Sequence, residues 1–341
     1  MRACIVLWAM LPLVKSFVPR KLNSAFHPGV SMNSAASVPI DSFVKGCPVY
    51  VVPFDKPDTE HVRRLRIVCI SDTHGFEDTL DDLPDGDILL HCGDFMPTRR
   101  ERTKDKPYKM KQDAGHRLDA FLAQQTHRYK IVLRGNHDRR VTFPLSGAHF
   151  ALRQEVINIE GLRLFLAPFT SKKYREPVLP QTEEPFDIWA SHFPPWGCLD
   201  ECYDGSHAGS SSLRRAAVSI PPQIRPRVWF FGHIHEAHGA RLESFEAAES
   251  DPVVPHSVKS GDDKAFMDDA SNAGDTEAEA VAIKVETKKT LCLNVANANE
   301  GRARCLVQPP TVCDVEYHSA VAASGSSGHS SALGEFTCQC K

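Results

Sequence analysis

Residues 66–75 have the sequence RIVCISDTHG, in which an Asp-x-His pair directly follows a run of apolar, largely β-branched residues. On a helix, Asp72 and His74 would point to nearly opposite sides. On an extended chain, residues two positions apart share one face and lie about 7 Å from each other. The stretch therefore predicts a buried β-strand that ends in two side chains able to bind one metal ion.

The same arrangement recurs along the chain, because further clusters of Asp, Asn and His follow further apolar runs. These clusters are Gly93-Asp94, Gly135-Asn136-His137-Asp138, Ser191-His192, Gly232-His233-Ile234-His235 and the segment 294–297. Each cluster alone is an ordinary turn or loop sequence. Because all of them follow predicted strands, we expect them to meet at the rim of a sheet and to hold metal ions there.

The donor groups in these clusters are imidazole, carboxylate and amide, with no thiolate. Such donors suit Mn, Fe, Zn or Ni better than a Cys-rich structural zinc site or a calcium site. They are too many for one tetrahedral ion, so we expect two ions about 3.5–4 Å apart that share a carboxylate and a water molecule. Two divalent ions (+4) with Asp72, Asp94 and a bridging hydroxide (−3) leave +1, which favours an anionic substrate such as a phosphate ester.

The apolar runs also predict the secondary structure. We expect strands at Arg66–Ile70, Asp87–His91, Tyr129–Leu133, Val156–Ile159, Leu162–Ala167, Phe186–Ala190, Val228–Phe231 and Leu291–Val295, with a hairpin at Gly161. Apolar residues at helical spacing predict helices over Gln112–Gln125 and around Leu213–Val218. Strands that alternate with helices early in the chain, and hairpins later, predict an α/β domain with mixed sheets.

Taken together, the motifs resemble those of the calcineurin-like metallophosphoesterase superfamily. Their local sequences are similar to those of the small MPPED-type (UPF0046) phosphodiesterases. The matching stretches are Ser71-Asp72-Thr73-His74-Gly75, His91-Cys92-Gly93-Asp94-Phe95, Arg134-Gly135-Asn136-His137-Asp138 and Phe231-Gly232-His233-Ile234-His235-Glu236. The resemblance covers residues 66–315 and implies a four-layer α/β/β/α sandwich of two mixed sheets flanked by helices.

The resemblance also implies a role for each residue of the clusters. Asp72, His74 and His235 would hold one ion, Asn136, His192 and His233 would hold the other, and Asp94 would bridge the two. His137 would donate a proton to the leaving group or steady the phosphate, and Asp138 would support a ligand or its loop. Phosphoprotein phosphatases carry G-D-x-x-D-R, whereas residues 93–98 are Gly-Asp-Phe-Met-Pro-Thr. This difference argues against a protein phosphatase and leaves the partner of His137 unidentified.

The expected activity is hydrolysis of a phosphodiester, such as a cyclic nucleotide or another small phosphoester, by a metal-bridging hydroxide. A phosphomonoester is the less favoured substrate. The cofactors would be two divalent ions, Mn, Fe or Zn. The formal charge of −3 and the lack of a basic stripe or aromatic run argue against a nuclease and a nucleic-acid partner. A non-catalytic nucleotide-binding or scaffold protein on the same fold is the alternative. Such proteins lose metal ligands, and this chain keeps them all.

The first forty residues contain no Asp or Glu, and their apolar run at 5–14 is too short for a membrane anchor. This region is similar to the bipartite presequence of algae with complex plastids, so we expect a plastid location. The secretory pathway, the mitochondrion and the cytoplasm are the alternatives. We expect a cleavable presequence at 1–40, a lead-in segment at 41–64, the catalytic domain at 65–316 with a disordered acidic insertion at 244–290, and a flexible tail at 317–341.

Overall fold

The computed structural model describes residues 47–53, 62–80, 83–97, 107–139, 141, 144–170, 179, 185–246, 281–282, 289–299 and 305–318. The predicted presequence, most of the predicted insertion and most of the predicted tail lie outside these residues. Their roles, and the plastid location, therefore stay predictions. In the described ranges, no helix combines the length and the apolar character needed to cross a bilayer.

The first sheet has seven strands in the order β11-β1-β13-β2-β3-β4-β5. Their bounds are Val49–Val52 for β1, Val62–Ile70 for β2, Ile88–His91 for β3, Tyr129–Leu133 for β4, His149–Ala151 for β5, Val281–Ala282 for β11 and Thr311–His318 for β13. The strands β2, β3, β4 and β5 run parallel, and β13 pairs antiparallel with β2. The carboxyl ends of β2, β3 and β4 therefore lie at the same edge.

The second sheet has six strands in the order β10-β12-β9-β8-β7-β6. Their bounds are Glu155–Ile159 for β6, Leu162–Ala167 for β7, Ile188–Ser191 for β8, Val228–Phe231 for β9, Gly239–Glu243 for β10 and Thr290–Asn294 for β12. The four central strands are parallel, and the two outer strands are antiparallel to their neighbours. The carboxyl ends of β8 and β9 thus also share one edge.

The two sheets pack on each other through alternate side chains of their strands. Ile67 and Leu90 of the first sheet belong to one buried cluster with Leu164 and Phe230 of the second. The neighbouring residue Val68 faces the opposite side and belongs to a different cluster. Because both faces of the central strands are buried, these strands are continuously apolar, as is typical of parallel sheets covered on both sides.

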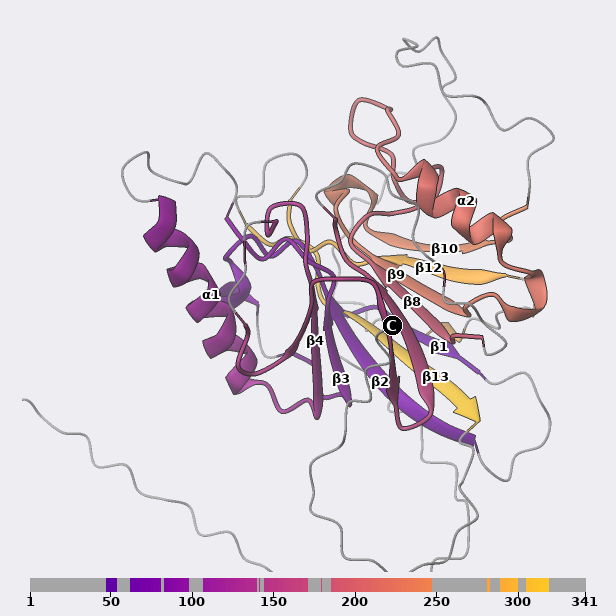
Figure 1. Cartoon of the computed structure of the whole chain (residues 1–341), viewed down its shortest axis with the longest axis horizontal. Coiled ribbons are helices and arrows are strands. Elements are labelled where there is room, and N and C mark those ends of the chain that lie inside the picture. Colours follow the sequence, from indigo (N-terminus) through magenta and orange to yellow (C-terminus); the bar gives the residue numbers. More distant parts are fainter. Residues whose placement is uncertain are drawn as a thin grey trace, which may run out of the picture. The chain divides into compact units, whose positions relative to one another are not determined.

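Helices cover the outer faces of the sheets. The described helices are α1 (Pro107–Gln124), α2 (Ser211–Ser219) and the short 3₁₀ helices η1 (Glu77–Thr79), η2 (Pro222–Ile224) and η3 (His235–Ala237). Leu118 of α1 packs in one cluster with Val68 of the first sheet, and Leu213 of α2 packs in another with Trp229 of the second. Figure 1 shows α1 beside β4 and β3, and α2 beside β10. These layers confirm the predicted α/β/β/α sandwich of mixed sheets.

The first sheet extends beyond the predicted domain limits. β1 lies in the predicted lead-in segment 41–64 and pairs with β13. β11 lies within the predicted insertion and pairs with β1, and β13 ends two residues past position 316. The sequence does not reveal these strands because β1 lies between Pro48 and Pro53, β11 has only two residues, and β13 is interrupted by Asp314 and Glu316.

Glu77 in η1 is a buried carboxylate, with 1% of its surface exposed. Neither oxygen has a hydrogen-bond partner among the described groups. Burial raises the pKa of Glu77 to about 7, against the opposing effects of its own backbone, Arg117 and Thr73. At pH values between the ordinary pKa of 4.5 and the raised pKa, Glu77 keeps its proton in the folded chain and loses it in the unfolded chain. Stability therefore falls as the pH rises through this window.

Replacing Glu77 by Gln is expected to stabilise the protein at high pH, because glutamine has no proton to lose. The free energy of unfolding should rise by about 3 kcal/mol at pH 8 and by less than about 1 kcal/mol at pH 5. Urea unfolding at the two pH values measures the difference. Asp204→Asn removes an exposed carboxylate and serves as the control. A gain in Glu77→Gln that does not depend on pH would contradict the assignment.

Candidate metal centre

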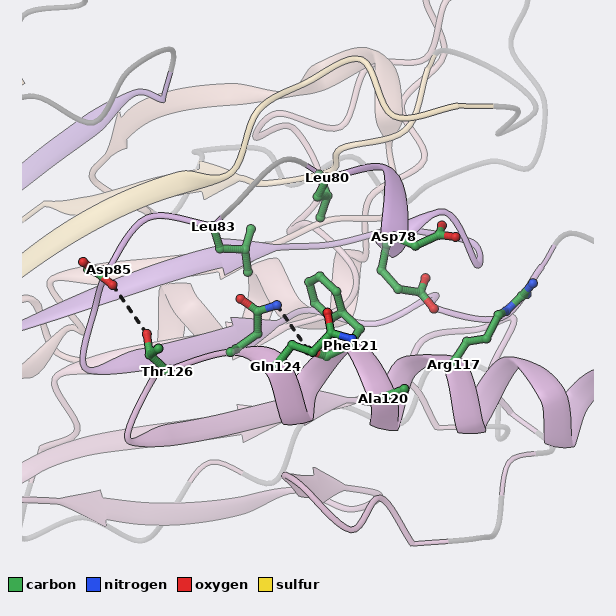
Figure 2. A pocket seen from close by; sticks show the side chains of 11 residues that line it. Asp78, Leu80, Leu83, Asp85, Arg117, Ala120, Phe121, Gln124 and Thr126 are labelled. Carbon is green, nitrogen blue, oxygen red and sulfur yellow. Dashed lines mark hydrogen bonds between the residues drawn. The ribbon is translucent and has the colours of Figure 1, made fainter. Parts of the chain in front are cut away.

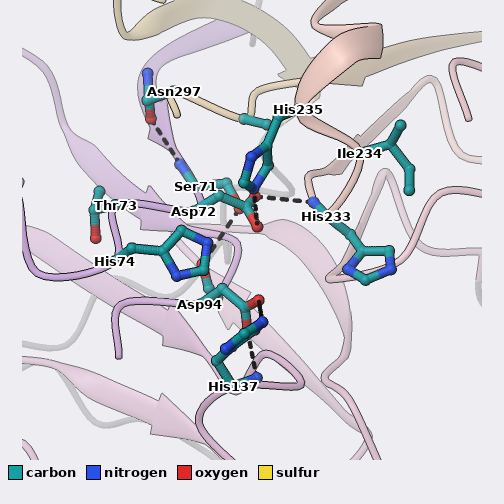
Figure 3. A network of polar contacts seen from close by, with 12 residues as sticks. Ser71, Asp72, Thr73, His74, Asp94, His137, His233, Ile234, His235 and Asn297 are labelled. Carbon is teal, nitrogen blue, oxygen red and sulfur yellow. Dashed lines mark hydrogen bonds and ion pairs between the residues drawn. The ribbon is translucent and has the colours of Figure 1, made fainter. Parts of the chain in front are cut away.

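The carboxyl ends of five strands from both sheets meet at one place. β2 is followed by Asp72 and His74, β3 by Asp94, β4 by Asn136 and His137, β8 by His192, and β9 by His233 and His235. Figure 3 shows Asp72, His74, Asp94, His137 and His235 close together, with His233 joined to Asp72 through its backbone N–H. The sequence predicted these residues as a group, and the fold brings them together.

The first group of possible ligands consists of Asp72, His74 and His235, whose ligand atoms all lie within 4.8 Å of one another. Nε2 of His235 lies 3.5 Å from Oδ1 of Asp72. Nδ1 of His74 bonds the carbonyl of Met96 at 3.0 Å, and Nδ1 of His235 bonds that of Asn299 at 3.0 Å. Because a carbonyl only accepts, each Nδ1 carries the hydrogen and each Nε2 keeps a lone pair for a metal ion.

The second group consists of Asp94, His192 and His233, which meet the same 4.8 Å limit. Nε2 of His192 lies 3.5 Å from Oδ1 of Asp94 and 2.8 Å from Oδ1 of Asn136, so the amide belongs to this group. Nδ1 of His192 bonds the carbonyl of Cys92 at 2.9 Å, so Nε2 is the atom that faces Asp94 and Asn136 and would be the ligand once a metal ion takes the place of its hydrogen.

A third set links the two groups. His74, Asp94 and His137 also have ligand atoms within 4.8 Å of one another. Asp94 therefore lies within reach of both groups, which is the position that a bridging carboxylate needs. Nε2 of His137 is 3.8 Å from Oδ2 of Asp94, and its side chain is 30% exposed. His137 is thus the group of this set that solvent reaches most easily.

The electrostatics of the centre favour positive charge. Burial acts to raise the pKa values of Asp72 and Asp94. The nearby imidazoles outweigh it: His235 holds the pKa of Asp72, and His192 that of Asp94, well below the usual range. Asp94 in turn raises the pKa of His192 to about 9 although burial opposes it. Burial lowers the pKa of His233 to about 3. The two buried carboxylates thus stabilise cations, which divalent metal ions would supply.

One buried oxygen tests whether a metal ion fits. Oδ2 of Asp72 accepts hydrogen bonds from Oγ of Ser71 (2.6 Å) and from the backbone N–H of His233 (2.9 Å). Oδ1 of the same carboxylate is buried and has no hydrogen-bond partner among the described groups. Such an atom is costly unless a cation or donor reaches it. One oxygen of Asp72 is fixed by hydrogen bonds, and the other faces His235 without one. This orientation fits a metal ligand.

The backbone at the centre is strained. Asp72, His74, Asp94 and His233 have φ values of 56°, 50°, 58° and 74°, in the left-handed region that residues other than glycine rarely adopt. They are four of the seven non-glycine residues with positive φ in the described ranges. Strain of this kind clusters at functional sites, because it turns side chains inward at the cost of local stability.

Two glycines allow the loops to approach one another. A Cβ at Gly135 would lie 2.1 Å from Oδ1 of Asp94. A Cβ at Gly232 would lie 2.1 Å from Oγ of Ser71 and 2.2 Å from Oδ2 of Asp72. The ligand loops therefore meet where only a glycine leaves room.

Gly232→Ala is expected to displace the Asp72 carboxylate and so to weaken metal binding. The free energy of unfolding should fall by about 1–3 kcal/mol, the usual cost of overpacking. Urea unfolding and a Mn²⁺ titration measure the two effects. Gly147→Ala is the matched control, because its Cβ would meet nothing closer than 3.7 Å. Equal behaviour of the two variants would show that Gly232 does not shape the centre.

Asp138 lies behind the ligands rather than among them. Its carboxylate accepts hydrogen bonds from the backbone N–H groups of Asp94 (2.7 Å), Met96 (3.0 Å) and Gly135 (2.8 Å). It therefore joins the loop after β3 to the loop after β4. The sequence predicted that Asp138 supports a ligand or its loop; that role stays a prediction, and the structure places the carboxylate against the backbone of both loops.

Three further supports were not predicted. Ser71 orients Asp72, and Asn297 accepts a hydrogen bond from the backbone of Ser71 at 2.9 Å. His91 is fully buried; its Nδ1 accepts from the N–H of Gly93 at 3.1 Å, and its Nε2 lies 3.0 Å from Oγ1 of Thr73. Ser71 and His91 lie in the stretches that carry the resemblance but were given no role. Asn297 lies in the segment 294–297, which was expected to help hold metal ions; its side chain instead bonds the backbone of Ser71, Gln308 and Pro309.

Comparisons with known proteins agree with this geometry. The family model described as calcineurin-like phosphoesterase matches residues 65–237, just over half of the chain. A UPF0046 protein of Caenorhabditis elegans is 24% identical over 284 residues, which cover 70% of this chain and 95% of that protein. Metallophosphoesterase domain-containing protein 1 of Homo sapiens is 26% identical over 235 residues, which cover 56% of this chain and 66% of that protein.

Two other proteins are similar to this chain, one over a small part of its own length and the other with a low TM-score. A probable rhamnogalacturonate lyase C of Emericella nidulans is 29% identical over 211 residues, which cover 54% of this chain but only 18% of the lyase. The solved structure of a protein of unknown function from Aquifex aeolicus is 20% identical, with a TM-score of 0.23, and covers 39% of this chain and 80% of that protein. Neither similarity carries an argument about activity.

Proposed function

The chain belongs to the calcineurin-like phosphoesterase family, and on that premise we propose that this metallophosphoesterase holds two metal ions and prefers phosphodiesters. The observation that carries the proposal is the position of Asp94, whose carboxylate lies within 4.8 Å of ligand atoms in both the His74 and the His192–His233 sets. A carboxylate shared in this way is the usual bridge of a two-metal site.

Each ion has its own set of side chains in this proposal. Asp72, His74 and His235 hold one ion, and Asn136, His192 and His233 hold the other, with Asp94 between them. When bound, two divalent ions such as Mn, Fe or Zn supply Lewis acidity, which activates water and neutralises charge on the phosphate. The protein fixes the ligand geometry through Ser71, Asp138 and the backbone carbonyls that hold each Nδ1 hydrogen.

Charge supports the preference for a diester. Two divalent ions (+4) and the buried carboxylates of Asp72 and Asp94 (−2) sum to +2. A diester anion and a hydroxide nucleophile together bring −2, so the reactants neutralise the centre. A monoester dianion would leave a net negative charge in a buried site, which is unfavourable.

His137 is the group that we assign to proton donation. Its backbone N–H donates to Oδ1 of Asp94 at 2.7 Å, which fixes the residue beside the centre. Its partly exposed ring lies 5.0 Å from that of His74, between the ligands and solvent. A leaving alcohol that departs toward solvent would therefore find an acid within reach.

A substrate panel with one leaving group tests the proposal. The full-length protein, purified with its metal content measured, is assayed on bis(p-nitrophenyl) phosphate and p-nitrophenyl phosphate with Mn²⁺ or Zn²⁺. We expect two ions per chain and a kcat/KM at least about tenfold higher for the diester, a difference of about 1.4 kcal/mol in the barrier. A higher kcat/KM for the monoester would overturn the proposed diester preference but not the two-metal site. A chain with no bound metal and no activity would instead support the non-catalytic scaffold.

A further inference from the structure

A cavity of about 490 Å³ lies between η1 and the carboxyl end of α1, and none of the candidate metal ligands lines it. Figure 2 shows Asp78 on one side, Leu80 and Leu83 above, and Phe121 and Gln124 of α1 below. The cavity therefore combines an acidic end with an apolar wall. The phosphoesterase chemistry makes no use of it.

The charged groups that line the cavity are mostly acidic. Glu77, Asp78 and Asp85 contribute −3 and Arg117 contributes +1, so the lining carries −2 when all groups are ionised. The last turn of α1 also faces this space, and it contains no basic residue. Because the carboxyl end of a helix is its negative end, the dipole of α1 adds to the attraction for a cation on the side of the cavity where Gln124, Thr126 and Asp85 lie.

The buried carboxylate of Glu77 is a second and independent observation. Both of its oxygens lack a hydrogen-bond partner among the described groups, although the residue is 99% buried and lines the cavity. The positive charge of Arg117 acts on this carboxylate but does not offset its burial, since the pKa of Glu77 stays raised. A buried carboxylate without a hydrogen bond therefore calls for an explanation, such as a bound ligand. A cationic ligand in the cavity would supply the missing partner and keep the carboxylate ionised.

The apolar wall narrows the chemistry of the ligand. In the part of the chain that the structure describes, Glu77, Asp78 and Asp85 do not bring three ligand atoms within 4.8 Å of one another, whereas a hard divalent ion needs six or more oxygen ligands around one point. Leu80, Leu83 and Phe121 line the cavity with apolar side chains. An alkyl chain would instead lie against these side chains while its charged end meets the carboxylates. We propose that this cavity binds an alkylammonium cation, with the ammonium group at Glu77 and Asp78 and the methylene groups against Leu80, Leu83 and Phe121.

The test is a calorimetric titration of the full-length, metal-loaded protein with cadaverine at pH 8. We expect saturable binding to one site. Glu77→Gln should weaken it at least tenfold, because the substitution keeps the shape and removes the charge. Asp78→Asn is a second variant that serves even if the first does not fold. Asp204→Asn, which removes a carboxylate outside the cavity, should bind cadaverine like the unaltered protein.

Two further probes test whether binding needs the ammonium charge, and whether the alkylammonium belongs to a free polyamine or to a lysine of a protein. Pentanol, which has the apolar stem without the ammonium group, should not bind. Nα-acetyl-lysine methylamide carries the same ammonium group as a lysine side chain of a protein. Tighter binding of this probe than of cadaverine would indicate that the natural ligand is a partner's lysine. Tighter binding of cadaverine would indicate a free polyamine. Absence of cadaverine binding at 10 mM, or equal binding by the unaltered protein and Glu77→Gln, would overturn the proposal. Because no metal ligand lines the cavity, either result leaves the phosphoesterase assay as a separate test.

Discussion

Replacing Asp94 by alanine is expected to remove both metal ions and to abolish phosphoesterase activity. The Asp94 carboxylate is 2% exposed and lies within 4.8 Å of ligand atoms in two different sets. In the proposed two-metal site every other ligand serves one ion, whereas Asp94 serves both, so its loss should weaken both. We expect kcat/KM on the diester to fall by about 10³-fold or more, since metal ions supply several kcal/mol of charge stabilisation in the transition state.

Two measurements check this expectation. Elemental analysis of the dialysed protein gives the number of ions per chain, and the initial rate with added Mn²⁺ gives the residual activity. Asp204→Ala removes an exposed carboxylate and should behave like the unaltered protein in both. Circular dichroism checks whether the Asp94→Ala variant is folded. Retention of two tightly bound ions by folded Asp94→Ala would contradict the bridging role.

Much of the fold follows from local sequence, because the central strands are buried on both faces. The strands β4, β7 and β9 begin and end where the apolar runs predict. β2 begins four residues earlier than predicted, at Val62, because exposed Arg63 and Arg64 continue the pairing with β13. Burial and hydrogen bonding need not coincide, so an apolar pattern alone misses such strand ends.

β13 shows why other strands are not predictable in this way. Asp314 interrupts its apolar pattern, yet its side chain is fully buried. Arg66 of β2 binds it through two hydrogen bonds of 2.8 and 2.9 Å, and the two residues are 248 positions apart in the chain. A buried carboxylate is acceptable only with such a partner. The sequence alone does not show that the partner will be adjacent.

The same reasoning separates the ligands from their supports. Ligands can be predicted because their residue types and their places after strands follow from coordination chemistry. The supports depend on contacts between distant segments, such as that of Ser71 with Asn297, 226 positions away. Asn297 lies in the last polar cluster of the sequence, but its side chain also binds the carbonyls of Gln308 and Pro309. Its role is therefore to hold loops in place, and only the fold reveals it.

Replacing His137 by glutamine is expected to spare the metal ions while slowing turnover by about 10²–10⁴-fold, the scale of losing a general acid. The geometry allows two roles for this residue, because its ligand atom also lies within 4.8 Å of those of His74 and Asp94. Its Nε2 is 3.8 Å from Oδ2 of Asp94, which is too long for a hydrogen bond. The number of ions per chain decides between the roles: two ions in the variant support the acid, and the loss of one would make His137 a ligand.

The leaving group gives a readout that a purely structural role would not change. p-Nitrophenolate departs without a proton, whereas an alkyl alcohol needs one in the transition state. If His137 supplies that proton, the loss of about 10²–10⁴-fold in His137→Gln should apply to a diester with an alkyl leaving group, and the loss on bis(p-nitrophenyl) phosphate should be at least about tenfold smaller. Gly147→Ala, whose added Cβ would make only ordinary contacts at 3.7 Å or more, should slow neither substrate. Equal losses on both substrates would assign His137 to positioning the phosphate, because that contact acts before either alcohol leaves.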